Sequence, residues 1–192
     1  MTMCKKISVC VPSYNRAGML LQLINSFFNQ IYANKELVIS DDSNTSAVQD
    51  LLESLPDDYR SQIAYYKNEE NLGYSKNLLK SLQRATGDFI VVLGDDDVFV
   101  QEKALDKYVE VFNQHPEVNY VYSNQIQFSN DLKTEYVFDS IKEDRIYSKG
   151  SESIRNMWLT SIFIPGMGFR NNMDFESIYP ENDLLFPQLE LV

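Results

Sequence analysis

Two kinds of apolar segment alternate along this chain as far as residue 123, and this alternation restricts the fold more than any other feature. Short β-branched runs typical of buried strands are each followed by a longer stretch in which apolar residues recur at helical spacing. The expected strands are 7–11, 36–40, 62–66, 88–93 and 118–123, and the expected helices are about 20–31, 48–55, 74–85 and 101–114. Such a chain is expected to form an α/β fold, a mostly parallel sheet with helices on both faces.

The pattern changes after residue 123. Residues 125–139 have the character of a β-hairpin, and residues 151–159 predict a short helix that begins at a serine cap. The final stretch, NDLLFPQLELV (residues 182–192), stops in mid-pattern, so we expect the chain to be cut from a longer protein. Because neither an internal repeat nor a low-complexity linker interrupts the sequence, we expect a single domain over residues 1–192.

The charge of the chain restricts its partners. With 28 acidic and 17 basic residues its formal net charge is -11, and such a surface repels phosphate backbones, so nucleic acid is not expected as a partner. An anionic ligand would need a local positive charge, for which a divalent metal is the obvious source. Neither a signal peptide nor a bilayer-spanning run is evident, so a soluble, cytoplasmic protein is expected. Cys4 and Cys10 are expected to be reduced and structural.

Polar residues gather where the expected strands end. The clearest case is DFIVVLGDDDVFV (residues 88–100), in which a buried strand runs directly into three aspartates. In an open parallel sheet the carboxyl ends of the strands share one edge, and ligands bind there. The candidate site residues that follow the first four strands are Pro12, Tyr14 and Arg16; Asp41 and Asp42; Asn71, Gly73 and Asn77; and Asp95, Asp96 and Asp97.

The three aspartates at 95–97 predict a metal–diphosphate site. Like charges on adjacent residues repel each other, and a hard divalent cation with oxygen ligands is the usual compensation. Such a cation takes one or two carboxylates together with phosphate oxygens of a substrate. The alternative is a solvated acidic turn, which the position at the end of a buried strand makes less favourable.

Other members of this set have structural alternatives. Asp41 or Asp42 could accept the N–H of a nucleobase, or one of them could cap the helix that follows. Tyr14 could stack on a base or simply pack against the protein. The segment 71–73, Asn-Leu-Gly, is typical of a turn.

Four segments resemble the family 2 glycosyltransferases of the GT-A fold, in the order and spacing of that family. They are ISVCVPSYNR, ELVISDDSN, NLGYSKNLLKSLQRATGDFI and VVLGDDDV, and they cover residues 7 to about 100. The LGDDD and NLGYSKN forms look like the branch that builds bacterial surface polysaccharides, including abequosyl- and rhamnosyltransferase-like enzymes.

The resemblance implies a Rossmann-like GT-A sheet and a hexosyltransferase-type enzyme that transfers a sugar with inversion from a nucleotide-diphosphate donor. It implies Mn²⁺ or Mg²⁺ bound through a DXD-type motif. Residues 1–123 would form the nucleotide-sugar-binding half and residues 124–192 the acceptor-side half. A saccharide or lipid-linked acceptor is implied, with peripheral contact at the inner membrane face; the oligomeric state is left open.

Carried over by position, Pro12 and Tyr14 would line the nucleoside pocket, and Asp42 would bond the base. Asp96 would lie at the ribose and the metal, and Asp97 would be the metal ligand. The commoner family pattern has another aspartate where this chain has glycine, at residue 94.

The resemblance places the catalytic base, which takes the proton of the acceptor hydroxyl, in the C-terminal half. Within PENDLLFPQLEL the first choice is Asp183, followed by Glu181 and Glu190, although each could equally cap or solvate a terminal helix. The glycines of IPGMGFRNN (residues 164–172) could let the backbone approach a sugar, and Arg170 could reach a phosphate or the acceptor; a plain turn explains them equally well.

Three other classes of protein share part of this pattern. A catalytically silent nucleotide-sugar-binding module would share the donor residues. A receiver-type phosphoacceptor domain would place its paired acids after the first strand, where this chain has PSYNR. A nucleotidyltransferase would need a glycine- and lysine-rich phosphate loop, which VPSYNRAGML does not provide.

Overall fold

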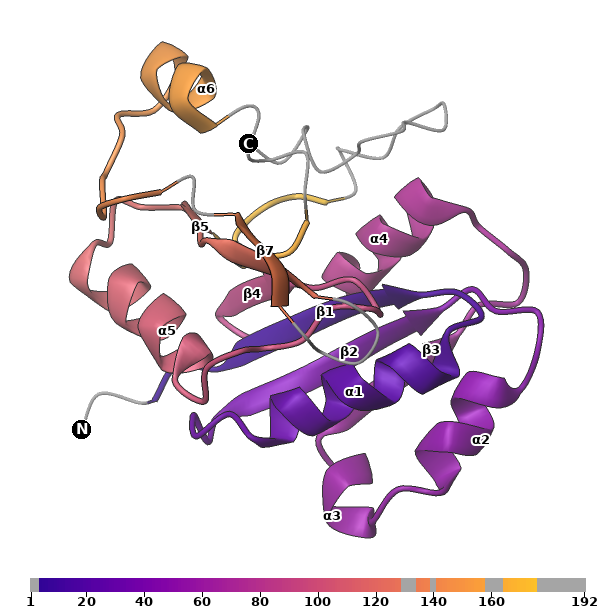
Figure 1. The fold of residues 1–192 in the computed structure, drawn as a ribbon. Helices are drawn as coiled ribbons and strands as arrows, with labels where there is room; N and C mark the ends of the chain where they lie inside the picture. The colour runs from indigo at the N-terminus through magenta and orange to yellow at the C-terminus, as the bar shows by residue number, and fades with distance from the viewer. Residues whose placement is uncertain (1–3, 129–133, 139–140, 158–163, 176–192) are drawn as a thin grey trace.

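A six-stranded sheet forms the centre of the structure, a computed structural model that describes residues 4–128, 134–138, 141–157 and 164–175. Its strands lie in the order β3-β2-β1-β4-β8-β5 (Figure 1). They are β1 (Ile7–Ser13), β2 (Lys35–Asp41), β3 (Ile63–Lys67), β4 (Phe89–Val92), β5 (Tyr120–Tyr122) and β8 (Met167–Arg170). The β1–β2, β1–β4 and β2–β3 pairs are parallel, so the expected mostly parallel sheet is confirmed.

Helices cover both faces of this sheet, as the alternation predicts. They are α1 (Ala17–Phe28), α2 (Ala47–Glu53), α3 (Asp57–Arg60), α4 (Tyr74–Gln83), α5 (Ala104–Gln114) and α6 (Ser151–Met157). Apolar residues of α1, α2 and α5 pack on one face, and those of α4 pack on the other. In Figure 1, α1 and α4 lie on opposite sides of the strands. The short helix α3 was not predicted.

The strands are apolar on both faces because both faces are covered. Ile7, Val9 and Val11 of β1 join the core under α1, α2 and α5, while Cys10 between them joins the core under α4. Both cysteines are free, and burial raises the pKa of the Cys10 thiol, which suits the predicted reduced, structural role.

The strand β8 is a correction to the expected order of elements. Met167–Arg170, taken above as a turn or sugar-contacting loop, is a strand that lies between β4 and β5 and pairs antiparallel with both. A Cβ on Gly168 would lie 2.7 Å from the Tyr108 ring. The glycine therefore lets Tyr108 of α5 pack closely against β8, rather than letting the backbone approach a sugar. Arg170 donates to the carbonyls of Val118 (2.7 Å) and His115 (3.0 Å), where it holds the end of α5. These contacts, together with an Arg170–Phe112 carbonyl bond, replace the phosphate or acceptor role considered for Arg170.

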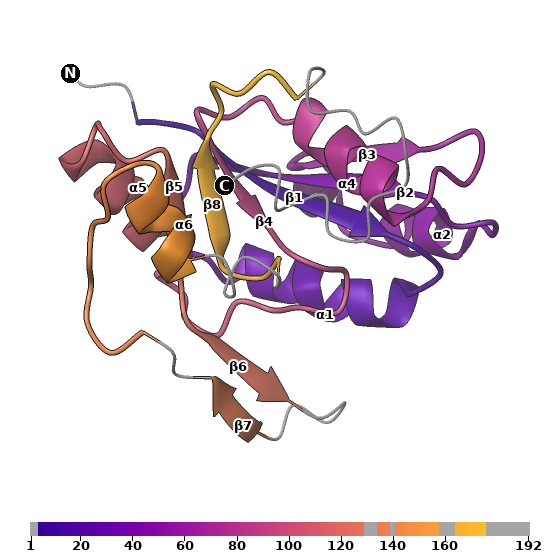
Figure 2. The same cartoon turned by 90° about the horizontal axis from the view of Figure 1, so that it is seen from above.

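The expected hairpin and the expected short helix are present. Strands β6 (Gln125–Phe128) and β7 (Thr134–Phe138) form a separate antiparallel pair, which stands away from the six-stranded sheet in Figure 2. Helix α6 follows, and Glu152 in its first turn accepts the backbone N–H of Ser148 at 2.9 Å. Among the residues described, none of the helices has the length and apolar character needed to cross a membrane.

Candidate active site

The carboxyl ends of β1, β2, β3 and β4 lie along one edge of the sheet, as predicted. Backbone bonds join the loops that leave them: the Asp42 N–H donates to the Ser13 carbonyl, and the Asn68 N–H donates to the Asp41 carbonyl, both at 2.9 Å. Polar residues from four separate segments therefore meet at this edge, which is where an open α/β sheet binds ligands.

Asp95 joins the turn after β4 to the end of β1. Its buried carboxylate accepts from the Ser13 hydroxyl (2.9 Å), the Tyr14 backbone N–H (3.1 Å) and the Arg16 guanidinium (3.2 Å). Burial raises the pKa of Asp95, although these donors oppose the shift. Two of the candidate residues, Asp95 and Arg16, are thus in direct contact, and the donors to this carboxylate come from the chain itself.

Asp96 and Asp97 are less fully compensated. Asp96 is exposed and accepts from Arg16 at 2.9 Å. In the described part of the chain, the donor to the Asp97 carboxylate is the Gly94 backbone N–H, at 2.6 Å. Burial raises the pKa of Asp97 to about 7, with the charges of Asp96 and Asp95 adding to the shift. A cation bound beside Asp97 would stabilise its ionised carboxylate and offset the repulsion from Asp95 and Asp96.

Gly94 leaves a notch between these two carboxylates. A Cβ at Gly94 would lie 2.9 Å from Asp96 Oδ1 and 2.9 Å from Asp97 Oδ2, so the two oxygens are at most twice that distance apart. They converge on a space that any side chain at residue 94 would fill. Within the described ranges, no group of three or more His, Cys, Asp or Glu residues is arranged to hold a metal ion by itself. Two hard oxygen ligands in an open turn fit Mn²⁺ or Mg²⁺ that shares its remaining positions with a substrate.

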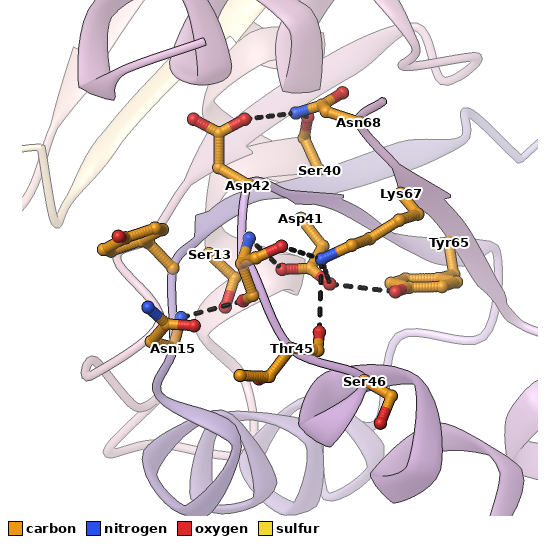
Figure 3. A network of polar contacts seen from close by, with 12 residues as sticks. Ser13, Asn15, Ser40, Asp41, Asp42, Thr45, Ser46, Tyr65, Lys67 and Asn68 are labelled. Carbon is orange, nitrogen blue, oxygen red and sulfur yellow. Dashed lines mark hydrogen bonds and ion pairs between the residues drawn. The ribbon is translucent and has the colours of Figure 1, made fainter. Parts of the chain in front are cut away.

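Asp41 points away from this turn. It is 0% exposed and accepts from the Tyr65 hydroxyl (2.9 Å), Lys67 Nζ (3.1 Å) and the Ser43 N–H (2.8 Å) (Figure 3). Lys67 also donates to the Ser43 and Thr45 carbonyls. This placement favours support of the loop after β2 over direct contact with a ligand, and it agrees with neither helix capping nor base binding.

Asp42 points the other way, toward the loop between β3 and α4 (Figure 3). Its Oδ2 accepts the backbone N–H groups of Leu72 (3.0 Å) and Gly73 (2.9 Å), and its Oδ1 accepts Nδ2 of Asn68 (2.8 Å). Gly73 has φ +78°, a left-handed conformation that suits glycine. Of the candidate residues after β3, Gly73 is thus in direct contact with Asp42.

Two further candidates close the same loop. Asn71 Oδ1 accepts the Gly73 N–H at 2.8 Å, which is the turn expected from Asn-Leu-Gly. The buried Asn77 donates to the Ser13 carbonyl at 3.2 Å and so ties α4 to the end of β1. A cavity of about 400 Å³ lies between the loops after β2 and β3, with Asp42, Lys67 and Asn71 among its lining residues.

Two exposed tyrosines stand at this edge. Tyr14, after the buried Pro12, and Tyr74, at the start of α4, are each 46% exposed. Burial and the nearby charge of Asp97 raise the pKa of the Tyr74 hydroxyl to about 12, which places this side chain in the field of the acidic turn.

Tyr74, Ser13 and Asn68 are not among the site residues expected from the sequence. Ser13 and Asn68 are polar residues at a strand end, a signal that could have identified them. The candidate bases Glu181, Asp183 and Glu190 lie outside the described residues.

Comparison with known proteins identifies the family of this chain. The chain belongs to glycosyl transferase family 2, whose family model matches residues 8–178. It is 36% identical over 98 residues to abequosyltransferase RfbV of Salmonella typhimurium, a match covering 50% of this chain and 29% of that protein. It is 31% identical over 115 residues to the GalNAc(5)-diNAcBac-PP-undecaprenol beta-1,3-glucosyltransferase of Campylobacter jejuni, covering 56% of this chain and 37% of that protein. These matches thus span well under half of either relative.

Two solved structures share the architecture. The TarS 1–349 fragment of S. aureus matches 95% of this chain and 53% of its own, with a TM-score of 0.72 at 22% identity. The mannosyltransferase PcManGT of Pyrobaculum calidifontis, solved with GDP-Man and Mn²⁺, matches 62% of this chain and 35% of its own, with a TM-score of 0.53 at 25% identity. The GT-A fold expected from the sequence is confirmed.

Proposed function

We propose that the chain carries the donor side of a metal-dependent, inverting glycosyltransferase that uses a nucleotide-diphosphate sugar. The observation that carries this proposal is the convergence of Asp96 and Asp97 on the Gly94 notch, at the same sheet edge as Asp42 and Tyr14. Carboxylates that are only partly compensated, an exposed aromatic ring and a carboxylate with an acceptor site to spare suit a ligand that has a diphosphate and a base.

Different residues would bind the diphosphate and the base of the sugar donor. Asp96 and Asp97 would hold Mn²⁺ or Mg²⁺, which when bound stabilises the negative charge of the departing diphosphate as a Lewis acid. Tyr14 would stack on the base, and Asp42 would accept one of its N–H groups. Asp95, bonded to Ser13 and Tyr14, would hold the two loops at a fixed distance. The structure of PcManGT in complex with GDP-Man and Mn²⁺ supports the use of a metal and a nucleotide-diphosphate sugar.

The acceptor side is proposed for residues 124–192, with residues 1–123 as the donor-binding half of a single domain. For inversion, a carboxylate must take the proton of the acceptor hydroxyl on the face opposite the diphosphate. We assign this role to Asp183, with Glu181 as the second choice. A saccharide or lipid-linked acceptor in cell-surface polysaccharide synthesis is supported by the names of the two relatives, and it would bring the protein to the inner membrane face.

The binding half of this proposal is tested by thermal shift with UDP, dTDP, CDP and GDP, each with and without Mn²⁺. A nucleotide at about 100 times its Kd stabilises the folded state by roughly 2.7 kcal/mol, a shift that is easily measured. A shift that requires both a nucleotide and Mn²⁺ is expected. If none of the four nucleotides shifts the transition, the proposal is wrong; if one binds but its sugar is neither transferred nor hydrolysed, the chain is a silent binding module.

A further inference from the structure

We propose that Arg84 and Asn68 are positioning residues that aim Asp42 at the nucleobase and thereby set base specificity. This inference rests on the proposed function, because it concerns the carboxylate that would meet the base. Arg84 neither lines the cavity nor hydrogen-bonds to Asp42; it would act through Asn68, which lines the cavity and contacts both Arg84 and Asp42.

Arg84 is fixed at the end of α4 by three contacts. Its Nη1 donates to the buried Ser40 hydroxyl at 2.7 Å, and its Nη2 donates to Asn68 Oδ1 at 3.0 Å. Its guanidinium also lies over the Tyr66 ring, 4.6 Å from the centroid. A planar cation held by two hydrogen bonds and a ring has little freedom, which makes it a rigid support for its neighbour.

Arg84 decides which way the Asn68 amide faces. An arginine can only donate, so the group that meets it must be the amide oxygen. The amide nitrogen therefore faces the other way, where it donates to Asp42 Oδ1 (2.8 Å) and to Asn77 Oδ1 (3.1 Å). The amide nitrogen also lies 3.4 Å from the Ser40 hydroxyl oxygen. Turning the Asn68 amide over would therefore break this long contact together with the bonds to Asp42 and Asn77 and the bond from Arg84.

The hydrogen bonds that Asp42 accepts leave one lone-pair site of its carboxylate for a ligand. Each carboxylate oxygen has two lone-pair sites. Oδ2 uses both for the Leu72 and Gly73 N–H groups, and Oδ1 uses one for Asn68. Among the residues that the structure describes, one acceptor site on Oδ1 therefore remains for a ligand.

One fixed acceptor selects among bases by their ring nitrogens. Uracil, thymine and guanine each offer a ring N–H. The equivalent ring nitrogen of cytosine carries a lone pair that a carboxylate repels, and cytosine offers only its exocyclic amino group, which lies to one side of that position. A site built to accept an N–H rejects a ligand that lacks it, because a polar group is then left unpaired. If the Asn68 amide were free to turn, its oxygen would face Asp42 and repel it. The Asp42 carboxylate would then no longer be held in the orientation that faces the base.

The experiment measures Kd by calorimetry for UDP, dTDP, GDP, CDP and inorganic pyrophosphate, all with Mn²⁺. The variants are Arg84→Met, Arg84→Lys and Asn68→Asp. The wild type is expected to prefer a base with a ring N–H over CDP by at least about tenfold, the free energy of one hydrogen bond. Arg84→Met and Asn68→Asp should lose most of that preference while the Kd of pyrophosphate, which reaches only the metal end, stays within about twofold. Arg84→Lys, which keeps the charge and can reach one partner, should recover part of it.

Two exposed positions serve as matched controls. Arg60→Met removes an arginine that pairs with Asp57 on α3, and Asn113→Asp changes an exposed asparagine of α5. Neither should alter any Kd. A wild type that prefers a ring N–H base, with Arg84→Met and Asn68→Asp variants that keep the preference, overturns this inference alone. Equal losses for nucleotides and pyrophosphate also overturn it, since they indicate a merely structural role. A wild type that binds no nucleotide overturns the proposed function and this inference together.

Discussion

The two acidic turns at the carboxyl edge of the sheet differ in how their charge is compensated. In the acidic pair after β2, Asp41 and Asp42 each accept three hydrogen bonds from the chain, from donors on β3 and the two adjoining loops. In the acidic turn after β4, Asp97 accepts one bond from a described residue and its pKa rises to about 7. The two turns look alike in the sequence, as SDDS and GDDD.

This difference in compensation implies that one turn stabilises the fold and that the other is suited to bind a ligand. A carboxylate whose lone pairs are filled by the protein stabilises the fold, because its removal leaves buried donors without partners. A carboxylate that is crowded by like charges stabilises nothing until a cation arrives. The acidic pair after β2 therefore stabilises this edge of the sheet and leaves one acceptor site on Asp42, whereas we propose that the acidic turn after β4 binds the metal.

The largest expected effect is on the acidic turn after β4. Asp97→Asn should lower Mn²⁺-dependent sugar transfer or donor hydrolysis by about a hundredfold or more. The reason is that the metal proposed to stabilise the charge of the departing diphosphate would lose one of its protein ligands. The melting temperature should stay the same or rise, since a repelled charge is removed. The matched control is Asp58→Asn on α3, which should change neither quantity; an Asp97→Asn protein with full metal-dependent activity would contradict the assignment.

The acidic pair after β2 should give the opposite result. Asp41→Ala should lower the free energy of unfolding by about 3 kcal/mol, because Tyr65 and Lys67 lose a buried acceptor. Urea unfolding measures this loss, and Asp97→Asn in the same buffer provides the comparison. Equal stability losses for the two variants would remove the distinction between the turns.

Gly94 sharpens the comparison within the acidic turn. Gly94→Ala places a Cβ 2.9 Å from Asp96 Oδ1 and from Asp97 Oδ2, so the two carboxylates must move apart. We expect Mn²⁺-dependent nucleotide binding to weaken about tenfold, with a loss of about 1 kcal/mol in unfolding free energy from overpacking. Calorimetry and urea unfolding measure the two quantities. Gly18→Ala on α1, where a Cβ meets nothing within 4 Å, should leave binding unchanged.

The smallest effect concerns a compensated acid at the opposite edge of the sheet. Burial would raise the pKa of Glu36, but hydrogen bonds from Lys6, Ser8 and Thr86 outweigh it and hold the pKa below the usual 4.5. The stabilisation is therefore complete above pH 4.5 and is lost as the pH falls through the lower folded value. The unfolding free energy, measured from pH 7 to pH 3, should fall less steeply in Glu36→Gln than in the wild type. Parallel curves would show that the hydrogen bonds of the Glu36 carboxylate contribute nothing to this pH dependence.

Much of the fold could be predicted because its signals are local. The β-branched run at 7–11 and the helical spacing at 74–85 each depend on a few neighbours in the chain, and β1 and α4 form there. The gathering of acids at one edge also follows from sequence, since parallel strands must end on the same side. β8 could not be found this way, because Gly168 makes sense only once Tyr108 of α5 lies against it.

The sequence by itself determined the class of fold, the edge at which polar residues meet and the family resemblance. Only the tertiary structure decided which aspartates are paired and which are not. Asp41 is compensated by Tyr65 and Lys67, and Asp42 by Asn68, all of which lie more than twenty residues away. Hydrogen-bond partners of this kind are chosen by the packing of β2 against β3, which no local pattern of residues records.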